Sequence, residues 1–207
     1  MAIDPDGARS AAASAESASI ATVRSFVAVL LPDELRRRLG VEIDALRPHA
    51  SGVAWVAAEN LHITLKFLGG VEEARLGEVG GALERAVTVP AFDVIVRGLG
   101  AFPTQARPRV IWAGTAGAPA FVRLAEDVDR ALAAVGFPPE PRGFTPHVTL
   151  GRVREPRRDP ALSAALEAGA TRLFGPLTVA RVSLMRSDLS SRGARYTELA
   201  GFGVPPA

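Results

Sequence analysis

The pattern of apolar and polar positions predicts short strands alternating with amphipathic helices. The first ordered element is the apolar run RSFVAVLLP, residues 24–32, which has the length of a buried strand and ends at a proline. From Leu35 to Leu46 apolar residues recur about one turn apart, which predicts a helix that starts at Asp33.

Further elements follow to the C-terminal end. Strands are expected at residues 53–56, 62–68, 92–99, 110–114, 147–153, 177–185 and 196–201. Helices are expected at residues 72–86, 118–135 and 160–168. Strands and helices mixed in this way, with hairpin-length connections, favour an α+β fold with antiparallel sheets.

The domain organisation is simple. Residues 1–22 are small and polar without periodicity, so we expect a disordered leader before a single domain of residues 23–207. No cysteine is present, and no stretch approaches the ~20 apolar residues of a membrane span. We therefore expect a cytoplasmic protein that contacts no membrane. We also expect it to be a monomer.

Two of the three histidines stand in the same short motif, His-x-Thr-Leu, at His62 and His147. In a strand, residues i and i+2 lie on the same face, so His62, Thr64 and Lys66 should share one face, and His147 and Thr149 should share another. Two such strand faces at one cleft would offer two imidazoles that titrate near neutrality and two hydroxyl donors. The alternative for each motif is a half-buried strand histidine bonded to its neighbours, and the repetition argues against it.

That set of side chains suits phosphoryl chemistry with no metal and no cofactor. The absence of cysteine and the presence of only three histidines make a Cys- or His-rich metal site hard to build. Net charge is +2, and Lys66 is the only lysine, so 24 − 1 = 23 of the basic residues are arginines. Arginine binds phosphate well, but a general preference for arginine codons is the favoured explanation of this composition, so charge alone does not settle the partner.

The sequence resembles the two-histidine (2H) phosphoesterases, and most closely the RNA 2′,3′-cyclic phosphodiesterases once described as 2′-5′ RNA ligases. The resemblance extends from about residue 24 to residue 201. It is carried by five segments: RSFVAVLLP, ENLHITLKFLG, RPRVIWAG, FTPHVTLGRV and SDLSSRGARYTEL.

The resemblance implies a bilobal, pseudo-twofold fold in which two antiparallel sheets face a central cleft, with helices outside. It implies hydrolysis of RNA 2′,3′-cyclic ends to 2′-phosphomonoesters, with His62 as proton donor and His147 as proton acceptor. Thr64 and Thr149 would hold the phosphate oxygens.

The resemblance implies two further substrate-binding residues, whose positions conflict with strict strand alternation. Arg152 corresponds to a substrate-binding arginine of the family, but strict alternation places it on the wrong face, so a bulge or twist is required. Phe67 would stack on a base or pack in the core, and alternation favours the core.

Other functions stay open at this point. The same chemistry would serve another cyclic phosphate, such as a cyclic nucleotide, or the reverse reaction that joins RNA ends through a 2′-5′ linkage. A non-catalytic RNA-end binder is the alternative from a different class. The roles of Lys66, Arg109 and Tyr196 are undetermined by the sequence.

Overall fold

The computed structural model describes residues 21–116, 119–191 and 193–204. Most of the expected leader lies outside these residues, and Thr22 already belongs to the first strand. The predicted α+β class with antiparallel strands is confirmed. In the described part, the helices are α1 (Asp33–Leu46), α2 (Leu76–Ala86), α3 (Pro119–Ala134) and α4 (Pro160–Ala168). The strands are β1 (Thr22–Leu30), β2 (Val53–Trp55), β3 (His62–Glu72), β4 (Phe92–Thr104), β5 (Arg107–Ala116), β6 (His147–Val153), β7 (Leu173–Val179), β8 (Arg181–Ser190) and β9 (Gly193–Gly203).

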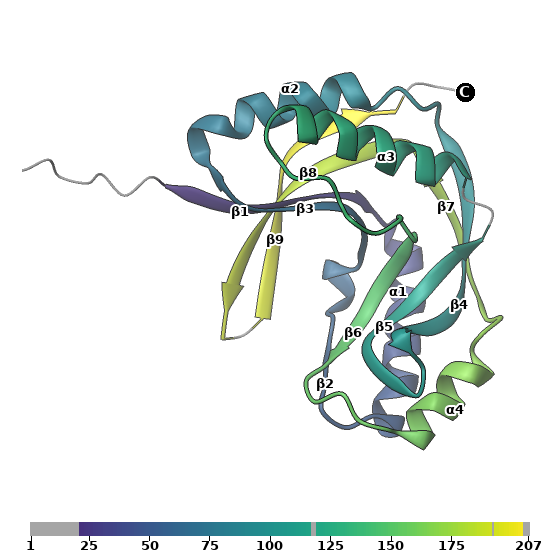
Figure 1. The fold of residues 1–207 in the computed structure, drawn as a ribbon. Coiled ribbons are helices and arrows are strands. Elements are labelled where there is room, and N and C mark those ends of the chain that lie inside the picture. Colours follow the sequence, from purple (N-terminus) through teal and green to yellow (C-terminus); the bar gives the residue numbers. More distant parts are fainter. Residues whose placement is uncertain (1–20, 117–118, 192, 205–207) are drawn as a thin grey trace, which may run out of the picture.

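The strands form two lobes. The first lobe consists of β1, β3, β8 and β9, and the second of β2, β4, β5, β6 and β7. The two sheets expected from the sequence are continuous, because Ile63 of β3 pairs with Val148 of β6 and joins the lobes in one strongly curled sheet (Figure 1). The two histidine motifs therefore lie side by side at the junction.

Each lobe is covered in part by a helix that follows a strand of the other lobe in the sequence. In Figure 1, α2 and α3 lie together over the first lobe, and α1 and α4 lie against the second. Helix α1 follows β1 of the first lobe but packs on β7, while α3 follows β5 of the second lobe but packs on β3. One large apolar core runs through both lobes, and a small second cluster of Phe26, Ala28 and Met185 lies apart from it.

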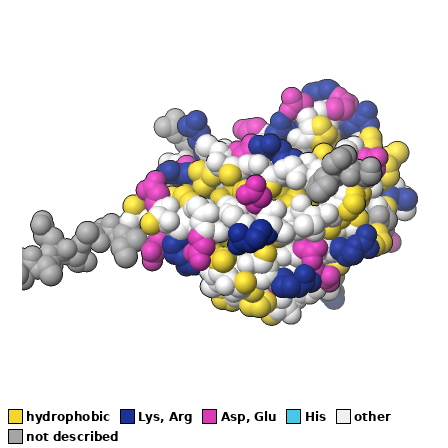
Figure 2. All heavy atoms as spheres, turned by 90° about the horizontal axis from the view of Figure 1, so that it is seen from above, with side chains coloured by type: hydrophobic (Ala, Val, Ile, Leu, Met, Phe, Trp, Pro, Cys, Tyr) yellow, Lys and Arg dark blue, Asp and Glu magenta, His cyan; other side chains and the backbone are white. Residues whose placement is uncertain are grey.

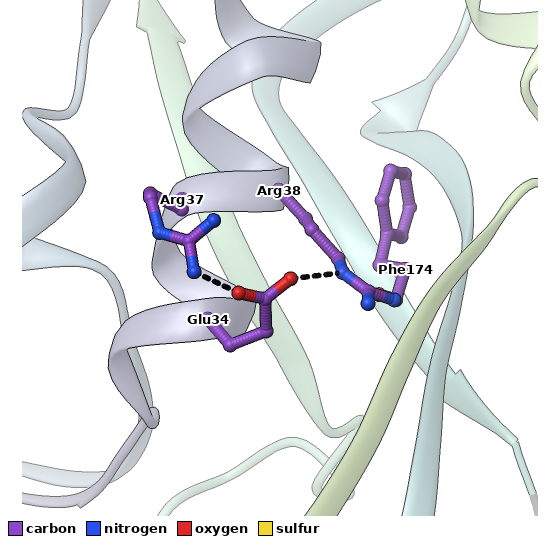
Figure 3. Close-up of polar contacts among 4 residues, drawn as sticks. All are labelled: Glu34, Arg37, Arg38 and Phe174. Atoms are coloured by element: carbon purple, nitrogen blue, oxygen red, sulfur yellow. Dashed lines mark hydrogen bonds and ion pairs between the residues drawn. The ribbon is translucent and has the colours of Figure 1, made fainter.

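Helix α1 is attached to β7 by an arginine near its start. The Nη1 of Arg38 donates to the carbonyl oxygen of Phe174 at 3.1 Å. Its Nε donates to Glu34 at 2.7 Å (Figure 3). Arg37 pairs with the same carboxylate. Charged residues near the start of α1 thus help to hold it on the opposite lobe.

Several strand limits differ from the sequence expectation. The run expected as one strand at residues 177–185 is two strands, β7 and β8, which belong to different lobes and meet at Ala180. Both hairpins are tighter than expected, since β4 continues to Thr104 and β8 to Ser190. Strand β3 continues through Gly69, whose φ of 72° is a conformation that glycine adopts without strain. These features depend on pairing partners that the local pattern does not contain.

Candidate active site

Both histidine motifs contain a β-bulge at the same position. Leu65 in β3 and Leu150 in β6 are the extra residues, because Lys66 and Thr64 pair with consecutive residues of β1, and Gly151 and Thr149 pair with consecutive residues of β5. A bulge reverses the alternation of the residues that follow it. The sequence-based assignment of faces therefore holds up to Thr64 and Thr149 and is wrong beyond them.

The bulge in β6 explains how Arg152 reaches the same face as His147 and Thr149. Leu150 and Gly151 are both buried, and Arg152 is exposed and lines the cleft with His147 and Thr149. The bulge that the sequence analysis required for Arg152 is present.

The bulge in β3 corrects two expectations. Phe67, which alternation placed in the core, is 55% exposed and lines the cleft. Lys66, expected on the face of His62, points instead toward α3, where its buried ammonium pairs with Asp129.

His62 is held by its neighbours on three sides. Its Nδ1 donates to the carbonyl oxygen of Asn60 at 2.7 Å, and its Nε2 lies 3.0 Å from Oγ1 of Thr64. Because a carbonyl oxygen only accepts, Nδ1 carries a proton and Nε2 is the nitrogen that gains or loses one. The rings of Phe26 and Tyr196 lie 4.8 Å and 5.3 Å from the imidazole, between centroids.

His147 repeats part of this arrangement. Its Nδ1 donates to the carbonyl oxygen of Thr145 at 2.7 Å, and the ring of Phe102 packs edge-on at 5.1 Å. Within the described residues, its Nε2 has no bond to Thr149 that corresponds to the bond between His62 and Thr64. Nε2 of His147 is therefore more available to accept a proton than Nε2 of His62, which is bonded to Thr64.

The pKa values of both imidazoles are lowered from 6.5. Burial is the main cause for each, and the hydrogen bonds to Asn60 and Thr145 oppose it in part. The positive charge of Arg152 lowers both pKa values further, and His147 lowers the pKa of His62. The two histidines and Arg152 are therefore near enough to interact electrostatically.

A cleft of about 1000 Å³ lies beside these groups. Five of the six expected site residues line it: Thr64, Phe67, His147, Thr149 and Arg152. His62 adjoins the cleft through its bond to Thr64. On the face seen from above in Figure 2, basic and acidic side chains are interspersed.

Some residues of the site were missed by the sequence analysis. Asn60 and Thr145 each stand two residues before a histidine, and Phe102 packs on His147. Tyr196, whose role the sequence left open, packs on His62. The equal spacing of Asn60 and Thr145 from the two histidines was visible in the sequence, but its meaning depends on where each strand begins.

No group of three or more His, Asp or Glu side chains that could hold a metal ion occurs among the described residues. No described helix is long and apolar enough to cross a bilayer.

The family sequence model of the 2′-5′ RNA ligase superfamily matches residues 31–190 of this chain. The chain belongs to this superfamily. A superfamily relative from Methanothermobacter thermautotrophicus, named RNA 2′,3′-cyclic phosphodiesterase, is 35% identical over 181 residues, which cover 87% of this chain and 98% of the relative. A protein of the same name from Aeropyrum pernix is 40% identical over 145 residues, or 70% of this chain and 82% of the relative.

Solved structures agree with this placement in the superfamily. TT0787 of Thermus thermophilus is 33% identical, with a TM-score of 0.72 over 88% of this chain and 98% of that one. LigT of E. coli, in complex with 3′-AMP, is 27% identical, with a TM-score of 0.72 over 89% of this chain and 99% of that one. The expected bilobal fold is thus confirmed both by the architecture and by its structural neighbours.

Proposed function

We propose that this protein hydrolyses 2′,3′-cyclic phosphate ends of RNA to 2′-phosphomonoesters without a metal ion. The names of its relatives support the general activity. The observation that carries the mechanism is the pair of half-buried imidazoles, which interact with each other and with Arg152 beside one cleft. A pure RNA-end binder would have no need for two groups that exchange protons.

The reaction is an in-line displacement at phosphorus. Nε2 of His147 removes a proton from water as the water oxygen bonds to phosphorus, and the bond between phosphorus and O3′ breaks. Nε2–H of His62 protonates O3′, which leaves a 3′-hydroxyl and a 2′-phosphomonoester. His62 regains its proton from solvent, and His147 releases its own.

The different settings of the histidines support these roles. The open Nε2 of His147 suits a base that must reach water, whereas His62 is held rigidly by Asn60, Thr64 and two aromatic rings. A bound phosphate anion favours the imidazolium form of His62 and offsets the effect of burial on its pKa.

The remaining site residues serve the phosphate and the nucleoside. The hydroxyls of Thr64 and Thr149 and the guanidinium of Arg152 donate to the non-bridging oxygens, where negative charge develops. The exposed ring of Phe67 offers a surface on which a base stacks.

The test is turnover of an oligonucleotide with a 2′,3′-cyclic end in excess EDTA, with the product identified by ³¹P NMR. We expect full turnover and a 2′-phosphate. An enzyme that is inactive until Mg²⁺ or Zn²⁺ is restored would refute the metal-independent mechanism. A 3′-phosphate product would reverse the substrate orientation.

A further inference from the structure

The cleft extends well past the two histidines, along the loop that connects α3 to β6. Its lining includes residues 140–145 of that loop, together with Glu126 and Asp129 of α3. The volume of about 1000 Å³ is at the top of the range of about 300–1,000 Å³ for pockets that bury one small ligand. One cyclic nucleotide therefore leaves part of the cleft unfilled.

The loop is braced by an ion pair whose ammonium group is buried. Nζ of Lys66, whose side chain is 1% exposed, donates to Asp129 and, at 2.6 Å, to the carbonyl oxygen of Pro138. Asp129 also accepts from the backbone N–H of Glu140 at 3.2 Å. Strand β3, helix α3 and the loop thus meet at one ammonium group, which fixes the loop residues along the cleft.

Arg142 is the cation that this loop presents. It is exposed, it lines the cleft, and it makes no ion pair within the described part of the chain. The cleft lining holds Lys66, Arg109, Arg142 and Arg152 against Glu126, Asp129 and Glu140, and the charge of Asp129 is offset by Lys66. An unpaired guanidinium on a fixed loop is suited to a phosphodiester, which its planar fork binds through two oxygens.

We infer that Arg142 binds the phosphate on the 5′ side of the terminal nucleotide, so that this part of the cleft holds the RNA strand. The inference rests on the proposed function and specifies its substrate as an oligonucleotide end rather than a free cyclic nucleotide. The catalytic groups act on the terminal phosphate in both substrates, whereas Arg142 has a partner only in the longer one.

The experiment compares kcat/KM for a 2′,3′-cyclic mononucleotide and for a trinucleotide with the same cyclic terminal residue. We expect Arg142→Ala to lower kcat/KM about tenfold for the trinucleotide and to leave the mononucleotide within about twofold. The slope of log kcat/KM against log salt for the trinucleotide should become shallower by about 0.7, the value for one contact to a single strand. Arg123 is an exposed arginine on α3 that does not line the cleft. Arg123→Ala is therefore the matched control, and it should leave kcat/KM unchanged for both substrates.

Equal losses on both substrates would overturn the inference, because Arg142 would then act at the reacting phosphate or on the fold. Unchanged turnover of the trinucleotide by Arg142→Ala would overturn it as well. Neither result would touch the proposed function, which the wild-type enzyme tests by itself through turnover of both substrates in EDTA and through the identity of the product.

Discussion

His62 and His147 each donate Nδ1–H to the carbonyl of the residue two positions earlier, so in the proposed mechanism each acts through Nε2. We expect His62→Ala and His147→Ala each to lower kcat by ~10²–10⁴-fold, the range for a positioned acid or base. The double variant should be little worse than the worse single variant, since both groups serve one step. His49→Ala is the control, because His49 lies at a separate pocket between α1 and α4. A single variant with near wild-type turnover would contradict the assignment.

The pH dependence of the rate follows from the lowered pKa values of the two histidines. In the proposed mechanism His147 must be neutral, and that form is lost as pH falls through its pKa. His62 must be protonated, and that form is lost as pH rises through its pKa. Burial lowers both pKa values from 6.5, so kcat/KM should follow a bell with its maximum below pH 6.5. The limbs belong to the coupled pair rather than to either residue. A kcat/KM that rises steadily through pH 9 would point to a different base.

At the scale of elements, the bulges decide which side chains reach the cleft. Alternation correctly predicts that His62 shares a face with Thr64, and His147 with Thr149. It fails at Lys66 and Phe67 because a bulge depends on the partner strand, which the sequence of β3 does not contain. Arg152 was identified only through the family resemblance, and its face could not be derived from its own strand.

Gly151 tests the bulge in β6. A Cβ atom there would lie 2.7 Å from Val53 and 2.9 Å from Trp55 of β2. We expect Gly151→Ala to lower the free energy of unfolding by about 1–3 kcal/mol, as overpacking does, in urea denaturation. Gly77→Ala on α2, where no atom lies within 4 Å, should be neutral or stabilising by up to about 1 kcal/mol. Equal stability of the two variants would mean that β2 moves aside without cost.

The brace between Lys66 and Asp129 can be measured by a double-mutant cycle. Lys66→Met leaves a carboxylate without its partner and should cost about 2–3 kcal/mol, less than for a fully buried pair because Asp129 is partly exposed. Lys66→Met combined with Asp129→Leu should recover part of this loss, with a coupling of about 1–3 kcal/mol. The exposed pair of Arg130 and Asp127 provides the comparison and should couple by no more than about 1 kcal/mol. Coupling of the same size in both pairs would show that the brace is no stronger than an exposed ion pair.

At the scale of the whole molecule, the two histidines make stability depend on pH. Their native pKa values lie below the unfolded value of 6.5, so below pH 6.5 the unfolded chain binds more protons than the native one. Their contribution therefore destabilises the fold progressively as pH falls below 6.5 through the native pKa, and it is absent at higher pH. The urea midpoint should drop less between pH 7.5 and pH 5.5 in the variant His62→Gln/His147→Gln than in the wild type. Equal drops would contradict the role of burial.

The crossing of α1 and α3 between lobes makes the two halves inseparable. A fragment cut after β5 would keep α1 without the β7 surface beneath it, and β3 would lose the α3 cover. We therefore expect that neither half folds alone, although each carries one complete histidine motif. For the same reason the halves cannot swing apart about a hinge, since opening would strip a helix from its sheet. The packing of α1 on β7 and of α3 on β3 therefore resists a hinge opening of the cleft, and under the proposed function we expect the RNA end to adapt to the cleft rather than the reverse.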